Sequence, residues 1–235
     1  MQGEIIKTEG TVLRIRPWSR TSHVVTWLTP DHGVVATLVK GAVRPKSFAL
    51  GQYDLFYTCE LLYYARATGG DLHALREVRP VQLREHLRGD WRATIMAGYA
   101  CDLAADLAPA NEESAQWHDF LTRFLDGGAT AGHPAARLVA LETGILRLAG
   151  LMPDLSGIDP SAEWVPFAID RGKTGSGTRI YRLSPAVAAA LLDPYSEKKI
   201  KILLDTIRFL GVFLTFPLEK PAEVRRMVVR TIDGN

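Results

Sequence analysis

The hydrophobic pattern of this chain changes its period near residue 80, and this change constrains the fold more than any other feature. Before Pro80, short segments alternate apolar and polar residues or are rich in β-branched and aromatic residues, which is typical of strands. After Pro80, apolar residues recur about every four positions, as on one face of a helix. The sequence therefore predicts an α+β protein whose first part is strand-rich and whose second part is mainly helical.

The first part contains five strand-like segments. A turn signal at residues 30–33 predicts that the second and third segments form a hairpin. Five short strands with one long connection fit a small closed barrel, and we expect a five-stranded OB-type barrel over residues 1–80. A five-stranded SH3-like barrel would give much the same pattern, so periodicity leaves both open. The expected strands are residues 10–16, 22–29, 33–40, 53–64 and 72–78.

Residues 81–235 are predicted to form a mainly helical domain. Asp90 is a suitable N-cap for its first helix, and Asn111, Pro134 and Ser196 are expected to open three more. Gly150 and Pro217 supply stop signals. An irregular insertion near 155–185 is predicted to contain a β-hairpin, with strands at 164–170 and 178–183. The apolar stripe of the first helix is predicted to be core and consists of Trp91, Ile95, Tyr99, Leu103 and Leu107.

Composition excludes several classes of protein. The 235 residues are 47% hydrophobic and 23% charged, as in a globular protein that buries a core. The sequence contains no run of about 18 apolar residues, so no membrane-spanning helix is expected. Residues 1–7 lack the features of a secretory signal. Cys59 and Cys101 have no neighbouring Cys or His at metal-site spacing. We therefore expect two buried thiols in a cytoplasmic protein.

Motifs for catalysis or cofactor binding are missing. The segment DRGKTGSG at 170–177 contains Gly-Lys-Thr, but Phe167 occupies the position of the first glycine of a P-loop. Gly175 and Gly177 then follow where a helix would have to start, so a hairpin turn is the better interpretation. The six histidines form no ligand pair, and no nucleophile elbow is present. The sequence predicts no catalytic residue, no metal and no cofactor, and a protein that acts by binding.

Charge is distributed unevenly along the chain. Residues 1–50 carry a net charge of +4, residues 91–160 carry −5, and residues 161–235 carry +4. A polyanion is therefore a plausible partner of the two basic ends. Ordinary solvation of a protein surface is the simpler alternative.

The segment VKGAVRPKS at 39–47 is the strongest candidate for a binding site. It places Lys40, Arg44 and Lys46 within seven residues on the connection that leaves the third strand. In an OB-type barrel, such loops at the rim contact oligonucleotides, and cations there would bind phosphates without sequence preference. Four aromatic residues are candidates for base stacking, although packing in the barrel is the simpler expectation for each: Trp18, Trp27, Phe48 and Tyr57.

Three segments resemble the RecO family, in the correct order. Residues 10–47 (GTVLRIRPWSRTSHVVTWLTPDHGVVATLVKGAVRPKS) are similar to its opening strands, which end in a loop of the form KGARR-x-KS. Residues 72–78 (LHALREV) resemble its fifth strand, and residues 141–155 (LETGILRLAGLMPDL) resemble the end of a helix of the form FELRLLALLGYAPDL.

The resemblance implies a mediator of the RecF pathway in the bacterial cytoplasm, associated with the nucleoid. Such proteins bind single- and double-stranded DNA, anneal complementary strands, and with RecR help to load RecA onto DNA coated by single-strand binding protein (SSB). They also bind the acidic C-terminal tail of SSB through the helical domain. By position, Lys40, Arg44 and Lys46 match the loop cations of the family. Arg14, Arg16 and Arg20 are expected as further DNA contacts, and Arg137 and Leu141 as contacts of the SSB tail.

The chain departs from the family at a zinc site. Many members carry four cysteines that start just after the motif PDLS, whereas this chain has Gly157 and Ile158 at that place. We therefore expect no zinc. A different class of function also stays open, namely a protein–protein adaptor whose barrel binds a partner and contacts nucleic acid only incidentally.

Overall fold

A computed structural model of the chain describes residues 4–65, 72–110, 112–130, 132–152, 155, 159, 161–169, 179–215, 218 and 223–233. The chain divides into two compact units. One comprises residues 1–129 with 226–228, and the other comprises residues 130–225 with 229–235. The two-domain division predicted near residue 80 stays a prediction.

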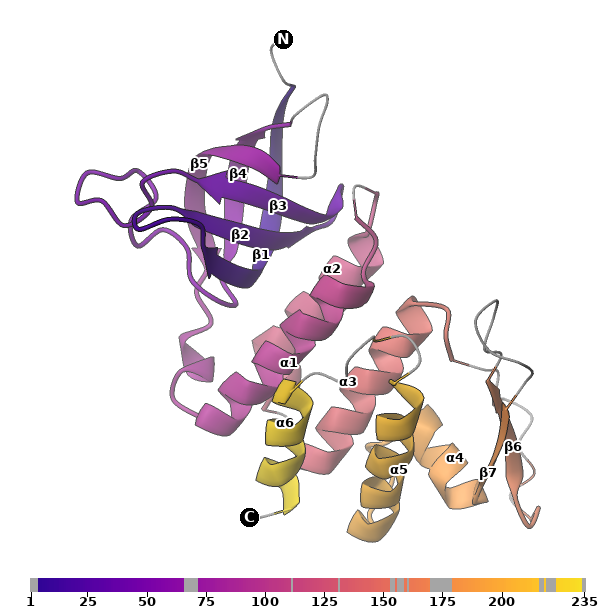
Figure 1. The fold of residues 1–235 in the computed structure, drawn as a ribbon. Helices are drawn as coiled ribbons and strands as arrows, with labels where there is room; N and C mark the ends of the chain where they lie inside the picture. The colour runs from indigo at the N-terminus through magenta and orange to yellow at the C-terminus, as the bar shows by residue number, and fades with distance from the viewer. Residues whose placement is uncertain are drawn as a thin grey trace. The chain divides into compact units, whose positions relative to one another are not determined.

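The first unit begins with a closed five-stranded barrel (Figure 1). The strand order is β1-β2-β3-β5-β4, with β4 pairing back onto β1, and β3 and β5 run parallel. The chain therefore skips one place between β3 and β4, which is the crossover of an OB-type barrel, so the SH3-like alternative is excluded. The strands are β1 (Ile5–Pro17), β2 (His23–Thr29), β3 (Gly33–Val39), β4 (Thr58–Tyr64) and β5 (Leu72–Gln82).

Strand β1 is long enough to pair with two neighbours. Its first half pairs with β4 and its second half with β2, and Thr11 has a partner in both. Gly10 allows a close approach in the barrel, since a Cβ there would lie 2.8 Å from Leu61 Cδ1. The register with β2 shifts between Val12 and Arg14, as in a β-bulge. Residues Gly10–Leu13 are all buried, and of these Val12 belongs to the barrel core.

The barrel core is aliphatic with a few aromatic rings. Trp27 is completely buried at its centre, and its indole N–H donates a 2.8 Å hydrogen bond to Thr37 Oγ1. The predicted hairpin of β2 and β3 is confirmed. The predicted fourth strand is wrong over residues 53–57, because Phe56 has a positive φ of 72° that extended backbone excludes. The main buried residues are Val12, Val25, Val35, Val39, Leu61 and Tyr63.

Two helices follow in the same unit, α1 (Trp91–Leu107) and α2 (Ala115–Arg123), with a π-helical turn from Phe124 to Gly128. The Asp90 side chain caps α1 by accepting a hydrogen bond from the Arg92 N–H, as predicted. Tyr99 and Leu103 are buried as expected, whereas Ile95 and Leu107 are only partly buried and Trp91 is exposed. The predicted stripe is therefore core only in part. The helix expected from Asn111 starts at Ala115, and residue 111 lies outside the described residues.

Arg84 joins the barrel to the helical part of this unit. Its side chain is buried and its backbone is left-handed, with φ 53°. The guanidinium donates to the Phe56 carbonyl at 2.6 Å and to Thr58 Oγ1 at 2.8 Å, and it forms an ion pair with Asp126 at 2.7 Å. The short turn Glu85–Leu87 (η1) follows directly. The left-handed backbone at this position is thus held by three polar contacts around one buried cation.

His118 lies in the same buried region. Its Nε2 is 3.4 Å from Thr11 Oγ1, and that hydroxyl is 2.8 Å from Thr58 Oγ1. Burial lowers the pKa of His118, and the nearby positive charge of Arg84 lowers it as well, whereas Asp119 and Asp31 raise it. The surroundings of His118 therefore favour its neutral form.

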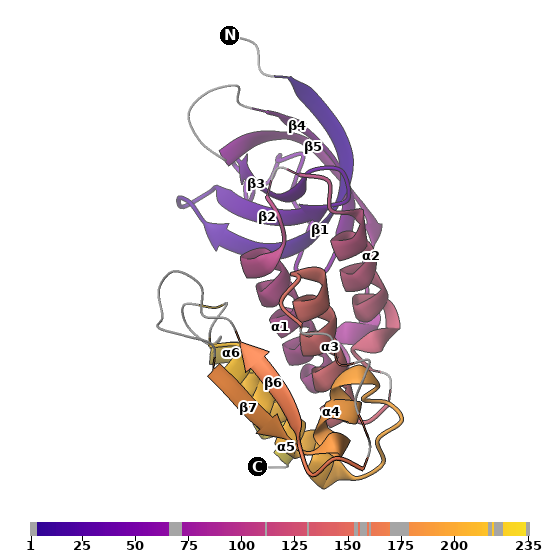
Figure 2. The same ribbon diagram turned by 90° about the vertical axis from the view of Figure 1, so that its right-hand side faces the viewer.

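The second unit is mainly helical and contains a two-stranded sheet (Figure 2). The predicted hairpin is confirmed as the antiparallel pair β6 (Val165–Ile169) and β7 (Arg179–Leu183). The helix α3 (Pro134–Leu148) is also confirmed, with Gly150 at φ 68° beyond its end. The helix expected from Ser196 is α5 (Ile200–Phe213), which starts four residues later. The helices α4 (Pro185–Leu192) and α6 (Glu223–Asp233) were not predicted, and α6 has residues in both units.

A buried ion pair links three helices of the second unit. Glu142 on α3 is fully buried, and both of its oxygens accept from Arg225 on α6, at 2.7 and 3.0 Å. Arg225 also donates to the carbonyl of Ile207 on α5 at 2.8 Å. Gly211 leaves room for this side chain, because a Cβ there would lie 2.7 Å from Arg225 Nη1. The two planar groups therefore fix how α3, α5 and the start of α6 pack.

Cys59 and Cys101 are free and buried as expected, and burial raises the pKa of each thiol to about 12. Within the part of the chain that the structure describes, no helix is long and apolar enough to cross a bilayer. Residues 156–158 and 170–178 lie outside the described residues, so the absence of zinc and the turn at DRGKTGSG stay predictions.

We predict that Arg84→Met strongly destabilises the protein. The substitution leaves the Phe56 carbonyl and the Thr58 hydroxyl buried without their donor, at about 1–3 kcal/mol for each group. The matched control is Arg79→Met, which removes an exposed pair with Glu60 and is expected to change the free energy of unfolding by about 0–1 kcal/mol. Urea unfolding measures both variants. Equal midpoints for Arg84→Met and Arg79→Met would contradict the role of Arg84.

We also predict that His118 makes stability depend on pH. Its folded pKa is below its unfolded value, so the unfolded chain binds the proton more tightly and stability falls as pH drops below about 6.5. His118→Gln removes this contribution, and its unfolding free energy should fall less between pH 7 and 5.5. The difference in slope is at most about 1.4 kcal/mol per pH unit. Parallel pH curves for the two proteins would show that His118 does not titrate in this way.

Candidate nucleic-acid interface

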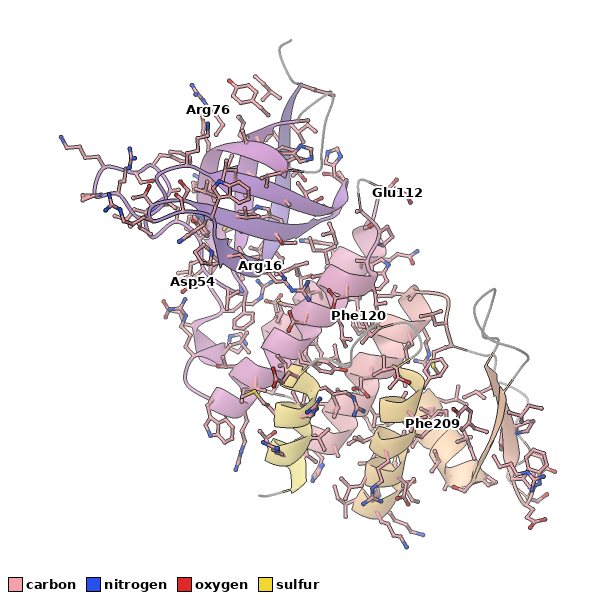
Figure 3. All side chains as sticks on the ribbon, in the orientation of Figure 1. Arg16, Asp54, Arg76, Glu112, Phe120 and Phe209 are labelled. Carbon is pink, nitrogen blue, oxygen red and sulfur yellow. The ribbon has the colours of Figure 1, made fainter. Side chains whose placement is uncertain are left out.

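The long connection between β3 and β4, residues 40–57, is a series of tight turns. Three successive backbone hydrogen bonds each join an N–H to the carbonyl three positions earlier. Arg44 N–H donates to Gly41 at 3.0 Å, Ser47 N–H to Arg44 at 2.9 Å, and Leu50 N–H to Ser47 at 3.3 Å. Gly41 has φ 66°, which favours glycine at the start of the loop. The loop projects from the barrel on the left of Figure 1, and Figure 3 shows nitrogen-bearing side chains along it.

A turn between β1 and β2, residues 18–22, lies against this loop. Ser22 is buried between the two, and its hydroxyl accepts a 3.1 Å hydrogen bond from the Gly41 N–H. Its carbonyl accepts from the Trp18 N–H at 2.8 Å, and the Thr21 carbonyl accepts from the Val43 N–H at 3.4 Å. Two segments about twenty residues apart in sequence are thus held as one surface.

Between the turn and the loop lies an open groove of about 710 Å³, which we call the rim groove. Its lining contains the three loop cations, Lys40, Arg44 and Lys46, and two aromatic residues, Trp18 and Phe48, but no Asp or Glu. All three cations are exposed, and none forms an ion pair within the described residues. The groove therefore concentrates uncompensated positive charge, which suits a polyanion.

The other predicted cations lie outside the lining of the rim groove. Arg20 is exposed and lies between the lining residues Ser19 and Thr21, at the edge of the groove, and Arg16 is exposed near the end of β1. Arg14 differs most from the three loop cations, and its role as a DNA contact stays a prediction. It forms ion pairs with Asp102 and Asp106 on α1, both at 2.8 Å, because its place after the β-bulge directs it to the helix. Its charge is already compensated within the protein.

The four candidate aromatic residues fall into two groups. Trp27 is core, and Tyr57 is half-buried with the Arg88 guanidinium 5.3 Å from its ring centroid. Trp18 is 62% exposed and Phe48 is 49% exposed, and both line the rim groove. Ser22 was not predicted as a site residue, since a serine in a turn gives no distinctive sequence signal.

Comparison with known proteins identifies the family. The family model described as "Recombination protein O N terminal" matches residues 1–84, and "Recombination protein O C terminal" matches residues 88–157. The DNA repair protein RecO of Anaeromyxobacter sp. (strain K) is 33% identical over 175 residues, which is 73% of this chain and 68% of the relative. This chain belongs to the RecO family.

Two further relatives agree. The DNA repair protein RecO of Anaeromyxobacter dehalogenans (strain 2CP-C) is 32% identical over 174 residues, covering 73% of this chain and 68% of the relative. That of Xanthomonas euvesicatoria pv. vesicatoria (strain 85-10) is 34% identical over 104 residues, covering 44% of this chain and 41% of the relative. The barrel and the rim groove lie wholly within the part that the N-terminal RecO model matches.

The partner site inferred from the RecO resemblance lies in the second unit and stays a prediction. Arg137 is half-buried on α3. Burial of Tyr195 raises the pKa of its hydroxyl, and the positive charge of Arg137 opposes this effect. Leu141 has no exposed surface and packs in the core. Of the two residues, only Arg137 has surface available to a partner in this conformation.

Within the described residues, His, Cys, Asp and Glu side chains form no group of three or more that could hold a metal ion.

We predict that Ser22→Ala loosens the connection between the turn and the loop. The Gly41 N–H loses its acceptor, which lowers the unfolding free energy by about 0.5–1.5 kcal/mol. Limited trypsin digestion should then cleave after Lys40 or Lys46 faster than in the parent protein. The control is Ser47→Ala, because among the residues that the structure describes Ser47 Oγ accepts only the nearby Ala49 N–H of the same loop. Equal cleavage rates in the two variants would rule out this role for Ser22.

Proposed function

We propose that this protein is a non-enzymatic mediator of DNA repair by recombination. It binds single- and double-stranded DNA, anneals complementary strands, and together with RecR helps to load RecA onto DNA coated by SSB. The rim groove carries this proposal, since three uncompensated cations meet there without a carboxylate in a RecO-family barrel. The protein acts by holding polymers together rather than by making or breaking bonds.

Electrostatics supply the mechanism. Duplex DNA carries one negative charge per about 1.7 Å of helix axis, and cations that contact phosphates release condensed counterions. Lys40, Arg44 and Lys46 would each contact backbone phosphates, with Arg20 at the edge and Arg16 nearby. Partial neutralisation of two strands lowers their mutual repulsion, so that complementary bases can pair.

The partners follow from membership of the family. Besides DNA, we propose RecR and the acidic C-terminal tail of SSB, bound by the helical part of the chain with Arg137 as one contact. The proposed setting is the bacterial cytoplasm, at the nucleoid. A division into a barrel domain at 1–80 and a helical domain at 81–235 is supported by the two family models, which meet between residues 84 and 88.

One observation favours the adaptor as a second candidate. On the barrel side of the same loop lies a hollow of about 350 Å³, whose lining includes the exposed side chains Val43, Leu50 and Leu55. Exposed apolar side chains that share one hollow suit a protein partner. An adaptor of this kind would bind DNA weakly, and its binding would not respond to changes at Lys40 and Arg44.

The test is fluorescence anisotropy of a labelled single-stranded oligonucleotide across a salt series. The variant Lys40→Glu/Arg44→Glu should bind more weakly. Its log–log salt dependence should flatten by about 1.4, because each phosphate contact on a single strand contributes about 0.7 to the slope. Annealing of complementary oligonucleotides should slow in parallel.

The control variant is Lys198→Glu/Lys201→Glu, which changes the net charge equally at two exposed lysines of the second unit. It should retain the parental salt slope for binding. Annealing that is undiminished in Lys40→Glu/Arg44→Glu would refute the rim groove as the DNA site. Negligible binding by the parent protein at low salt would favour the adaptor.

A further inference from the structure

We infer that the rim groove recognises unpaired bases through Trp18 and Phe48, so that its preferred ligand is single-stranded DNA rather than duplex. This inference rests on the proposed function and assigns a different task to each kind of side chain. The cations bind the backbone that both forms of DNA share. The two rings bind the base faces that only a single strand exposes.

The exposure of the two rings is the first observation. Trp18 and Phe48 are large apolar side chains with about half or more of their surface in water, although the barrel core lies close by. Single exposed apolar residues are common and need no explanation. Here two exposed rings come from different segments and line one groove together with its three cations. That combination of stacking surfaces and a positive groove is the one that single-stranded nucleic acid uses.

The backbone beneath both rings is held in place. The Trp18 N–H donates to the Ser22 carbonyl, and the Ser22 hydroxyl accepts from the loop at Gly41. Phe48 lies between Ser47, whose N–H is bonded to the Arg44 carbonyl, and Ala49, which is buried in the barrel core. The rings are therefore presented from anchored positions, which reduces the entropy that a ligand must remove on binding.

Both rings border the open space of the rim groove. Phe48 also lines a second hollow, of about 390 Å³, along β4 and β5 with Leu62 and Val78, so the ring has space on two sides. Other exposed aromatic residues of the first unit carry an arginine over the ring, as Trp91 does with Arg92 at 5.4 Å and Tyr64 with Arg76 at 6.0 Å. No arginine covers Trp18 or Phe48 within the described part of the chain.

Base pairing decides which form of DNA can use these rings. In a duplex, each base is stacked between its neighbours and paired, and contact with an aromatic ring would require extrusion of the base, which costs a few kcal/mol. A single strand presents unstacked bases at once, and every base has a face that can stack, so the contact does not depend on sequence. Duplex binding in this groove therefore depends on phosphates alone.

An abasic oligonucleotide separates the two contributions, because it has the sugar–phosphate backbone but no bases. We would compare three probes of equal length by anisotropy: oligo(dT), an abasic oligonucleotide and a duplex. The proteins are the parent, Trp18→Ala, Phe48→Ala and the double variant, each checked for an unchanged melting temperature. Two controls remove similarly exposed side chains outside the rim groove, Trp91→Ala on α1 and Leu50→Ala in the same loop.

We expect the parent to bind oligo(dT) at least about fivefold more tightly than the abasic probe, from the range measured for base–aromatic stacking. Trp18→Ala and Phe48→Ala should each lose part of this preference and the double variant all of it. Affinity for the duplex and the salt slope should stay unchanged, and the conservative variants Trp18→Phe and Phe48→Tyr should retain the preference.

Equal affinity of the parent for oligo(dT) and the abasic probe would overturn the inference and leave the phosphate-binding function intact. So would losses that are equal for all three probes, or a preference that survives the double variant. A parent protein that binds none of the probes would refute the proposed function itself, which distinguishes that failure from failure of the stacking role.

Discussion

Closure of the barrel depends on the double pairing of β1. One strand serves as neighbour to both β4 and β2. Gly10 lets Leu61 approach, and a bulge between Val12 and Arg14 shifts the register of β1 against β2. The second half of β1 leads into the turn at 18–22, which lies beside the β3–β4 loop. Ser22 connects the turn to the loop by its hydrogen bond with the Gly41 N–H. The rim groove forms because β2 pairs with β3 in a register that sets His23 opposite Val39, so the turn before His23 and the loop after Val39 lie side by side. The same bulge directs Arg14 to the carboxylates of α1, which compensates its charge.

Buried charge is used for geometry in both units. Arg84 and the Glu142–Arg225 pair are desolvated, and desolvation offsets much of the Coulomb attraction of buried ion pairs, so their net contribution to stability is small compared with the penalty for removing one partner. These buried charged groups instead fix the orientation of the elements that pack around them. A planar guanidinium with fixed acceptors tolerates few arrangements of the elements around it. Arg84 specifies how the barrel meets the helical turn of Asp126, and Arg225 specifies how α3 and α5 meet the start of α6.

The cations and rings of the rim groove respond to different conditions. Contacts between lysine or arginine and phosphate weaken steeply with salt and are indifferent to base pairing. Stacking on Trp18 and Phe48 would respond little to salt and would require unpaired bases. A surface with both properties can hold a strand firmly while it is single and release the bases once they pair, with the phosphates still bound. That order of events suits an annealing protein.

The sequence by itself determined which elements form and most of their order. Alternation placed the barrel strands, Asp90 and Pro134 marked helix starts, and the motif KGAVRPKS located the basic loop. Local patterns could not find α4, whose residues are apolar all round, or the break at Phe56, whose φ is imposed by the surroundings. Tertiary structure alone decided the strand order, the pairing of Arg14 with α1, and which aromatic residues face water. Each of these depends on contacts between residues far apart in the chain, and side-chain type does not encode which distant partner will neutralise a charge or cover a ring.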